Sequence, residues 1–178
     1  MFGVKDIQVN ESPSKYLSRG INNRVTIGNI EGVSPEGANP YINITLHKES
    51  ATIEDGKTFK LSFAETAKKY SVMKLTHIAT KVITLDDMVA IDESSTSIED
   101  FATRLNAVLR GQTINWFKLS VEQYMNANNE VKERLVIGLP PFADNSIQTK
   151  LKFSETNPYD YKAVKAPAVT AQSDDLPF

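Results

Sequence analysis

Apolar and polar residues alternate along three successive segments in the first third of the chain. These segments cover residues 21–30, 41–47 and 57–63, and turns rich in Gly, Pro, Asn and Asp separate them. Side chains of a strand point alternately to opposite faces of a sheet, so this pattern predicts half-buried strands. We therefore predict an antiparallel meander whose core-facing residues are Val25, Ile27, Ile30, Ile42, Ile44, Leu46, Phe59, Leu61 and Phe63.

The hydrophobic period changes to that of a helix after residue 63. A short helical piece is predicted at residues 64–70, and a longer helix follows within residues 71–83. Residues 86–97 are acidic and rich in Ser, which is typical of a connector between two elements. The helical spacing before this connector is set by Val72, Leu75, Ala79 and Val82.

A second helix is predicted after the connector. Thr96 followed by Glu99 three residues later has the pattern of a capping box, in which each side chain bonds the backbone of the other residue. The helix is expected to end at Arg110, because Gly111 suits the left-handed position that follows many helices. Its predicted apolar stripe consists of Ile98, Phe101, Leu105 and Val108.

Strand-like alternation resumes in the last third of the chain, over residues 113–124, 131–137 and 147–153. The first of these strands places Ile114, Trp116, Lys118 and Ser120 on the polar face. The residues predicted to face the core are Phe117, Leu119, Val121, Val131, Leu135, Ile137, Ile147, Leu151 and Phe153.

A meander, an inserted helical segment and closing strands follow one another in the order of an OB-type barrel. The sequence therefore predicts a mainly β fold, an OB-like antiparallel barrel in residues 1–161 with a helical insertion at about residues 64–111. Other small barrels and α+β sheets share this order of elements and remain alternatives. Residues 162–178 lack any period and are rich in Ala, Pro, Ser and Thr, which predicts a disordered tail.

The outward positions of the predicted strands are basic and aromatic, whereas acidic residues gather in the turns and the connector. Single-stranded DNA needs cations for its phosphates and aromatic faces for its bases, so this surface predicts DNA binding. Trp116 is the expected stacking residue, although a register shift of one position would bury it instead. The predicted contacts are Arg24, Tyr41, Lys60, Trp116, Lys118, Lys132, Arg134, Lys150 and Lys152.

The composition of the chain argues against several classes of function. The 178 residues contain no Cys, which excludes thiolate metal sites and is compatible with the reducing cytoplasm. No signal peptide or membrane span is visible, so we expect a cytoplasmic protein. His47 and His77 lie thirty positions apart, which does not suit a zinc site, and the acidic connector is expected to be solvated rather than to hold Mg²⁺. Phosphate-loop and nucleophile motifs are missing, so neither an enzyme nor a cofactor is indicated.

The end of the chain combines acidic, apolar and aromatic residues after the predicted tail. The ring and carboxylate of a C-terminal Phe suit capture by an apolar pocket with a basic rim. This tip resembles the C-terminal tip of bacterial and phage single-stranded-DNA-binding proteins, with two acidic residues where the bacterial tip usually has three. The residues that match are Asp174, Asp175, Leu176, Pro177 and Phe178.

The resemblance implies sequence-independent binding and protection of single-stranded DNA during replication, recombination or repair. It also implies that the tip recruits a helicase, polymerase or nuclease. The long helical insertion and residues 137–142 favour a phage-encoded version, acting in the cytoplasm of a bacterial host. The alternatives are a virion or assembly module that binds no nucleic acid, and an RNA-binding barrel. The net charge of −2 decides nothing, because binding depends on local charge.

Overall fold

The computed structural model describes residues 14–164. Within this range a long sheet carries the strands in the order β3-β2-β1-β4-β5, with each neighbouring pair antiparallel. The long strands are β1 (Gly20–Val33), β2 (Tyr41–Lys48), β3 (Lys57–Ser62), β4 (Thr113–Met125) and β5 (Val131–Val136). The turn before β3 contains a short 3-10 helix, η2 (Ile53–Asp55).

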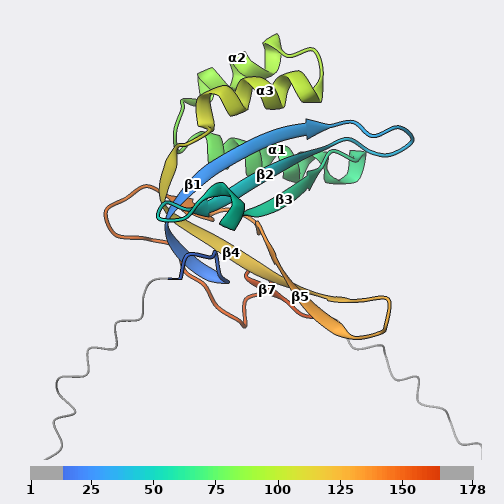
Figure 1. Cartoon of the computed structure of the whole chain (residues 1–178), viewed down its shortest axis with the longest axis vertical. Coiled ribbons are helices and arrows are strands. Elements are labelled where there is room, and N and C mark those ends of the chain that lie inside the picture. The colour runs from blue at the N-terminus through green and yellow to red at the C-terminus, as the bar shows by residue number, and fades with distance from the viewer. Residues whose placement is uncertain (1–13, 165–178) are drawn as a thin grey trace, which may run out of the picture.

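Three helices are inserted between β3 and β4, which is consistent with the predicted OB-like fold with a helical insertion. They are α1 (Glu65–Ala79), α2 (Leu85–Ser94) and α3 (Ile98–Leu109). Figure 1 shows α2 and α3 at one end of the molecule and the β4–β5 hairpin at the other. The mainly antiparallel fold agrees with the predicted class, but among the described strands no ladder joins β3 to β5, so the sheet does not close into a barrel.

The meander of β1, β2 and β3 is confirmed. Eight of its nine predicted core positions are buried, and Phe63 packs partly buried against the same core. Ile27 and Ile30 both face inward although they are three positions apart, because the pairing of β1 with β2 shifts between Ile27 and Asn29. Such a bulge adds one residue to a strand and restores the inward direction of the residues that follow.

Helix α3 lies against β1 and closes the core on that side (Figure 1). The side-chain oxygen of Asn106 accepts a hydrogen bond from the backbone N–H of Ile30, at 2.8 Å. The two backbones approach closely at Gly32, where a Cβ atom would lie 2.4 Å from the carbonyl oxygen of Ile98. A glycine is therefore needed at this crossing. Leu105 and Leu109 fill the space between helix and sheet.

The acidic connector predicted at residues 86–97 is wrong, because most of it forms α2. Thr84 caps this helix: its hydroxyl accepts the backbone N–H of Asp87, and the Asp87 carboxylate accepts the N–H of Thr84, both at 3.1 Å. Met88 then buries its side chain in the core, and Ile91 packs partly buried beside it. The first helical segment also differs from the prediction, since α1 is one continuous helix that ends at Ala79.

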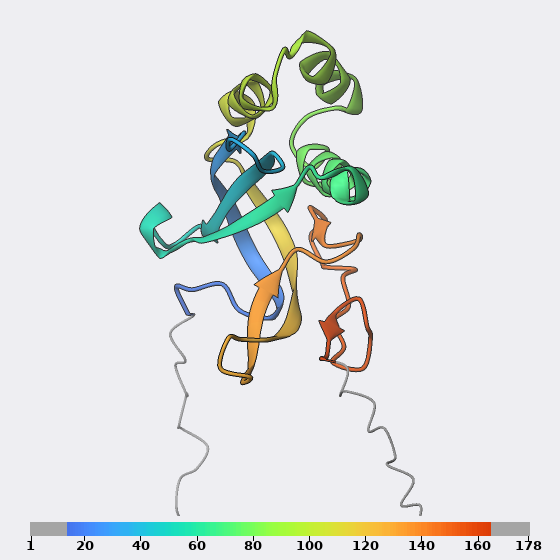
Figure 2. The same ribbon diagram turned by 90° about the vertical axis from the view of Figure 1, so that its right-hand side faces the viewer.

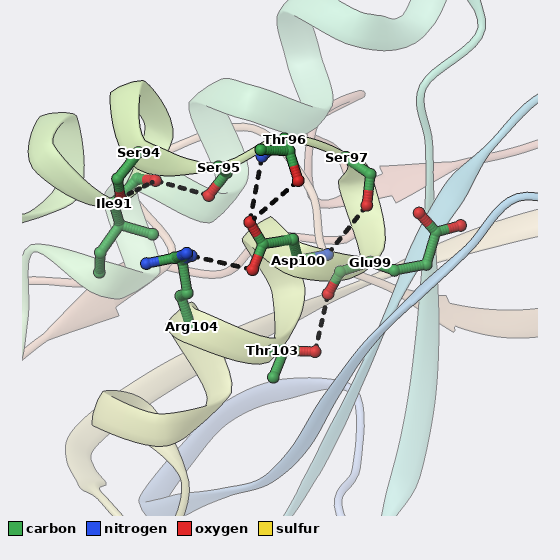
Figure 3. Close-up of polar contacts among 9 residues, drawn as sticks. All are labelled: Ile91, Ser94, Ser95, Thr96, Ser97, Glu99, Asp100, Thr103 and Arg104. Carbon is green, nitrogen blue, oxygen red and sulfur yellow. Dashed lines mark hydrogen bonds and ion pairs between the residues drawn. The ribbon is translucent and has the colours of Figure 1, made fainter.

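The start of α3 lies one residue later than predicted (Figure 3). Ser97, not Thr96, is the N-cap, and its hydroxyl accepts the backbone N–H of Asp100 at 3.1 Å. The Asp100 carboxylate in turn accepts the N–H of Thr96 at 3.0 Å and pairs with Arg104 at 2.9 Å. Gly111 has a φ of 80°, which confirms its predicted left-handed position after the helix. Val108 of the predicted stripe is exposed, whereas Leu109 and Ala102 are buried.

The predicted strand over residues 147–153 does not form. Two short strands take its place, β6 (Ala143–Asp144) and β7 (Tyr161–Lys162), and both pair with β4. Ile147 is 96% exposed instead of facing the core, although Leu151 is buried and Phe153 is half-buried. Val131 is also exposed, and Ile114, which was expected on the polar face, is fully buried.

Candidate nucleic-acid interface

The outward side of β2 and β3 places an aromatic ring next to a cation. Tyr41 pairs with Ser62 across the two strands, and Lys60 pairs with Asn43, so the two side chains are diagonal neighbours. The Lys60 ammonium lies 3.8 Å from the centre of the Tyr41 ring. Tyr41 is half-buried and Lys60 is exposed. The inward neighbours Ile42 and Ile44 are fully buried, which fixes the direction of this face.

A second aromatic and cationic group lies on the β4–β5 hairpin. Tyr124 stands directly opposite Lys132, and the Arg134 guanidinium lies 5.4 Å from the centre of the Tyr124 ring. Tyr124 is 40% exposed. The hairpin extends away from the core at this end, as Figure 2 shows, so both faces of its tip meet solvent. Its turn at residues 126–130 includes Asn129 in the left-handed region, with a φ of 59°.

Glu122 holds together the cations at the base of this hairpin. Its carboxylate accepts the Arg134 guanidinium at 2.6 Å and the Lys162 ammonium at 3.1 Å. The hydrogen bond from Arg134, together with that from Lys162, holds the pKa of Glu122 below its usual range. Lys132 pairs with Glu130 at 3.0 Å. The side chains of Arg134, Lys132 and Lys162 remain more than half exposed.

Trp116 and Lys118 lie on the side of β4 that residues 143–162 cover. The Trp116 ring nitrogen donates to the carbonyl oxygen of Ser146 at 3.0 Å, and the side chain is half-buried. Lys118 is 6% exposed and its ammonium pairs with Asp160, itself 1% exposed. The expectation that Lys118 lies exposed on a polar face is therefore wrong. Alternation gives the side of a strand on which a residue lies, but not what covers that side.

Arg24 is exposed but already held by other side chains. Its guanidinium makes a bidentate contact with the Glu49 carboxylate, in which the Nε atom lies 2.7 Å from one oxygen. Its Nη1 atom donates a hydrogen bond to the side-chain oxygen of Asn115 at 3.2 Å. The bond from Arg24 lowers the pKa of Glu49. Arg24 also has a φ of 49°, in a backbone region that residues other than Gly rarely adopt.

Lys150 and Lys152 are exposed, as predicted, but they belong to an irregular segment rather than a strand. The Asp144 carboxylate organises this segment by accepting the backbone N–H groups of Lys150 and Ser146, both at 2.9 Å. These bonds, with a further one from the Ser146 hydroxyl, lower the pKa of Asp144 to about 2.

The structure therefore brings the predicted residues together in two groups and leaves others apart. Tyr41 joins Lys60, and Lys132 joins Arg134 beside Tyr124. Within residues 14–164, four of the seven predicted cations are in ion pairs: Arg24, Lys118, Lys132 and Arg134. Tyr124 was not among the predicted contacts because it ends its strand, and Lys162 was expected in the tail. The tip residues 174–178 lie outside the described part of the chain.

Comparison of the sequence with models of known protein families and with curated proteins finds no match. Across residues 14–164, no helix combines the length and the apolar character needed to cross a membrane. In the same range, no three His, Cys, Asp or Glu side chains gather as a metal site would require.

Proposed function

We propose that this protein binds single-stranded DNA without sequence preference, through the two aromatic and cationic groups on its sheet. The observation that supports this most directly is the Lys60 ammonium 3.8 Å from the Tyr41 ring. The ammonium lies over one face of this ring, and when it moves to a phosphate the ring offers that face to a base. The pair lies on β2 and β3, and OB-type folds bind oligonucleotides on the corresponding strands.

The β4–β5 hairpin supplies the second part of the proposed surface. The loop between the last two strands is another common contact of OB-type folds with nucleic acid. Arg134 and Lys132 already pair with glutamates, but exposed ion pairs contribute only about 0–1 kcal/mol. A phosphate can therefore take the place of Glu122 or Glu130 at low energetic cost. Lys150 and Lys152 extend the proposed surface, whereas buried Lys118 and half-buried Trp116 are left out of it.

Recruitment of replication, recombination or repair enzymes by residues 174–178 is the second half of the proposal. It rests on the resemblance of the sequence Asp-Asp-Leu-Pro-Phe to the tip of single-stranded-DNA-binding proteins. A phage origin, with action in the host cytoplasm, rests on the long helical insertion and on residues 137–142. Removal of residues 173–178 is expected to leave the DNA affinity unchanged or higher while a partner enzyme is no longer bound.

Fluorescence anisotropy of a labelled thirty-nucleotide oligo-dT tests the DNA-binding half. Tyr41→Ala and Tyr124→Ala should each weaken binding by about 5- to 150-fold, since one stacked base contributes about 1–3 kcal/mol. Tyr159→Ala is the matched control, because Tyr159 is 62% exposed and belongs to neither group. Double-stranded DNA and oligo-U of equal length separate the proposed preference from duplex and RNA binding. If the protein fails to bind oligo-dT at low salt, the proposal is wrong.

A virion or assembly module remains the second candidate. The observation in its favour is that Val72, Leu85 and Val89 are 42%, 56% and 45% exposed on neighbouring helices. Exposed apolar side chains gathered on one surface are typical of protein contacts. Stable association with another protein, without any affinity for oligo-dT, would favour this function over DNA binding.

A further inference from the structure

An apolar groove of about 570 Å³ opens between α1, α2 and the start of α3. Figure 2 shows α1 and α2, both in green, on the same side of the molecule. Buried Leu75 and Met88 form the floor of the groove, and exposed Val72, Leu85 and Val89 form its rim. Leu85 and Val89 are four residues apart on α2, so they share one face of that helix.

The rim of this groove is a surface without a partner in the described part of the chain. Val72 is 42% exposed, Leu85 56% and Val89 45%, and all three line the same hollow. Soluble monomers rarely expose apolar side chains in one continuous patch, and such patches mark interaction sites. The groove is therefore expected to be covered when the protein acts.

The two walls of the groove carry opposite charge. Lys68 lines the groove from α1, and Lys69 is exposed beside it on the same helix, which has three lysines against one glutamate. The α2 wall presents acidic residues, and this helix contains no basic residue. Each of these charged side chains is exposed, and none forms an ion pair within residues 14–164. Of the acidic residues of α2, Asp92 lines the groove, whereas Asp86 and Glu93 are exposed outside its lining.

We infer that a second copy of this chain fills the groove, with α1 of each copy packed on α2 of the other about a two-fold axis. A two-fold interface makes every contact twice, so a surface with one basic and one acidic wall is complementary to itself. Lys68 and Lys69 of each copy then face the acidic residues of α2 in the other copy, and the exposed apolar rims cover each other.

Charge argues against the chain's own acidic end as the occupant. Asp174 and Asp175 would bring two more carboxylates towards Asp92 in the groove and towards the exposed Asp86 and Glu93 on the same helix. Like charges at close range are unfavourable, and only Lys68 and Lys69 on the opposite wall would offset them. A second copy places opposite charges against both walls, whereas the acidic end of the chain does so for the basic wall alone.

Sedimentation velocity of the full chain without nucleic acid tests the inference, at protein concentrations from about 1 to 200 μM, the micromolar range of moderate affinities. The expected species has twice the 19.8 kDa mass of one chain. Val89→Asp should weaken the dimer at least tenfold, because it places a carboxylate in the apolar rim. Val131→Asp is the matched control: Val131 is 51% exposed on β5, outside the groove, and its replacement should leave the dimer intact.

Exchange of charge between the walls gives the decisive result. One variant combines Lys68→Glu with Lys69→Glu, and the other combines Asp86→Lys, Asp92→Lys and Glu93→Lys. Each variant alone should be monomeric, because both of its walls then have the same sign, and an equal mixture should form a heterodimer. Circular dichroism establishes that each variant is folded, and recovery of association in the mixture shows that neither has lost its groove.

Three outcomes would overturn the inference. These are a wild-type chain that stays monomeric throughout the concentration range, a charge variant that dimerises alone, and a mixture that stays monomeric. A chain without residues 173–178 must dimerise like the full chain. If that deletion changes the dimer affinity more than tenfold, the chain's own end competes for or forms the contact, and the assignment of the groove to a second copy is wrong. DNA binding takes no part in any of these measurements.

Discussion

The ammonium of Lys118 and the carboxylate of Asp160 form an ion pair whose two side chains are only 8% and 2% exposed. The residues lie 42 positions apart, on β4 and immediately before β7. Asp160 also accepts the backbone N–H of Ser154 at 3.1 Å, and its own carbonyl accepts that of Val121 at 2.9 Å. This pair therefore fastens the last irregular segment of the described chain onto the sheet.

Removal of one partner of this pair should destabilise the protein strongly. Lys118→Met leaves the Asp160 carboxylate buried without its cation, and loss of one partner of a buried pair typically costs about 3–5 kcal/mol. Urea unfolding followed by Trp116 fluorescence measures the change. The exposed pair of Arg24 and Glu49 is the control, and Glu49→Gln should cost at most about 1 kcal/mol. Equal losses for the two variants would contradict the buried role of Lys118.

Gly138 and Ser120 should show coupled effects on stability. A Cβ atom on Gly138 would lie 2.4 Å from the Ser120 hydroxyl oxygen and 2.9 Å from the carbonyl oxygen of Tyr159. Gly138→Ala should therefore cost about 1–3 kcal/mol, as overpacking does. Among residues 14–164 the buried Ser120 hydroxyl has no hydrogen-bond partner, so Ser120→Ala alone should be neutral or stabilising. The double variant Gly138→Ala/Ser120→Ala should regain part of the unfolding free energy that Gly138→Ala loses. If the effects of the two single substitutions simply add, the contact between these residues is contradicted.

Asp144 should make stability fall in strong acid. Its pKa is lowered from 3.8 to about 2 in the folded protein, so its contribution is present above pH 3.8 and is lost as the pH falls towards 2. Asp144→Asn should lower the melting temperature at pH 7 and flatten its decline between pH 4 and 2. Differential scanning fluorimetry across this range checks the result, with Asp86→Asn as a control on exposed α2. A decline of unchanged steepness in Asp144→Asn would contradict the prediction.

His77 should contribute a second acid-sensitive step at higher pH. Burial, together with nearby Lys81, lowers its pKa from 6.5, and its ring lies 4.6 Å from that of Phe142. The unfolded chain therefore binds a proton more readily than the folded one, and stability falls as the pH drops through 6.5. His77→Phe should remove the part of the decline that sets in below pH 6.5 in urea unfolding. His47→Phe is the matched control. If His47→Phe also removes the fall in stability below pH 6.5, this fall does not come from His77.

The salt dependence of DNA binding should identify the cations that meet phosphate. Each neutralised phosphate of a single strand contributes about −0.7 to the slope of log affinity against log salt. Lys60→Ala should therefore reduce the slope by about that amount, whereas Lys118→Met should leave it unchanged because Lys118 is buried. Anisotropy titrations between about 50 and 300 mM salt give the slopes. Identical slopes for wild type and Lys60→Ala would remove β2 and β3 from the proposed surface.

Alternation predicted the strands well where one face of a strand meets the core and the other meets solvent. Ile42, Ile44 and Leu46 illustrate this, since all three are fully buried between half-buried polar residues. The same reasoning failed at residues 147–153: Asp144 binds the backbone N–H of Lys150 within this segment, and Asp160 binds that of Ser154 directly after it. Side-chain bonds of this kind compete with a sheet and leave no trace in hydrophobic periodicity.

The candidate site was less predictable than the fold. The sequence could place Tyr41 and Lys60 on one face, because adjacent strands of a meander fix their register locally. It could not show that Asp160 covers Lys118, since that contact depends on chain 42 residues away. Helix α2 was missed for a related reason: its acidic composition outweighed the signal of Thr84 and Asp87, which form its cap.

The pairing of β7 with β4 fixes the position at which the last fourteen residues of the sequence begin. Tyr161 and Lys162 pair with Val121 and Glu122, and the N–H of Val164 donates to Gln123 at 3.2 Å. The fourteen residues that follow can span at most about 50 Å from that anchor. Under the proposed recruitment, an enzyme bound at residues 174–178 would stay near the β4–β5 hairpin, at a local concentration set by this length rather than by its abundance in the cell.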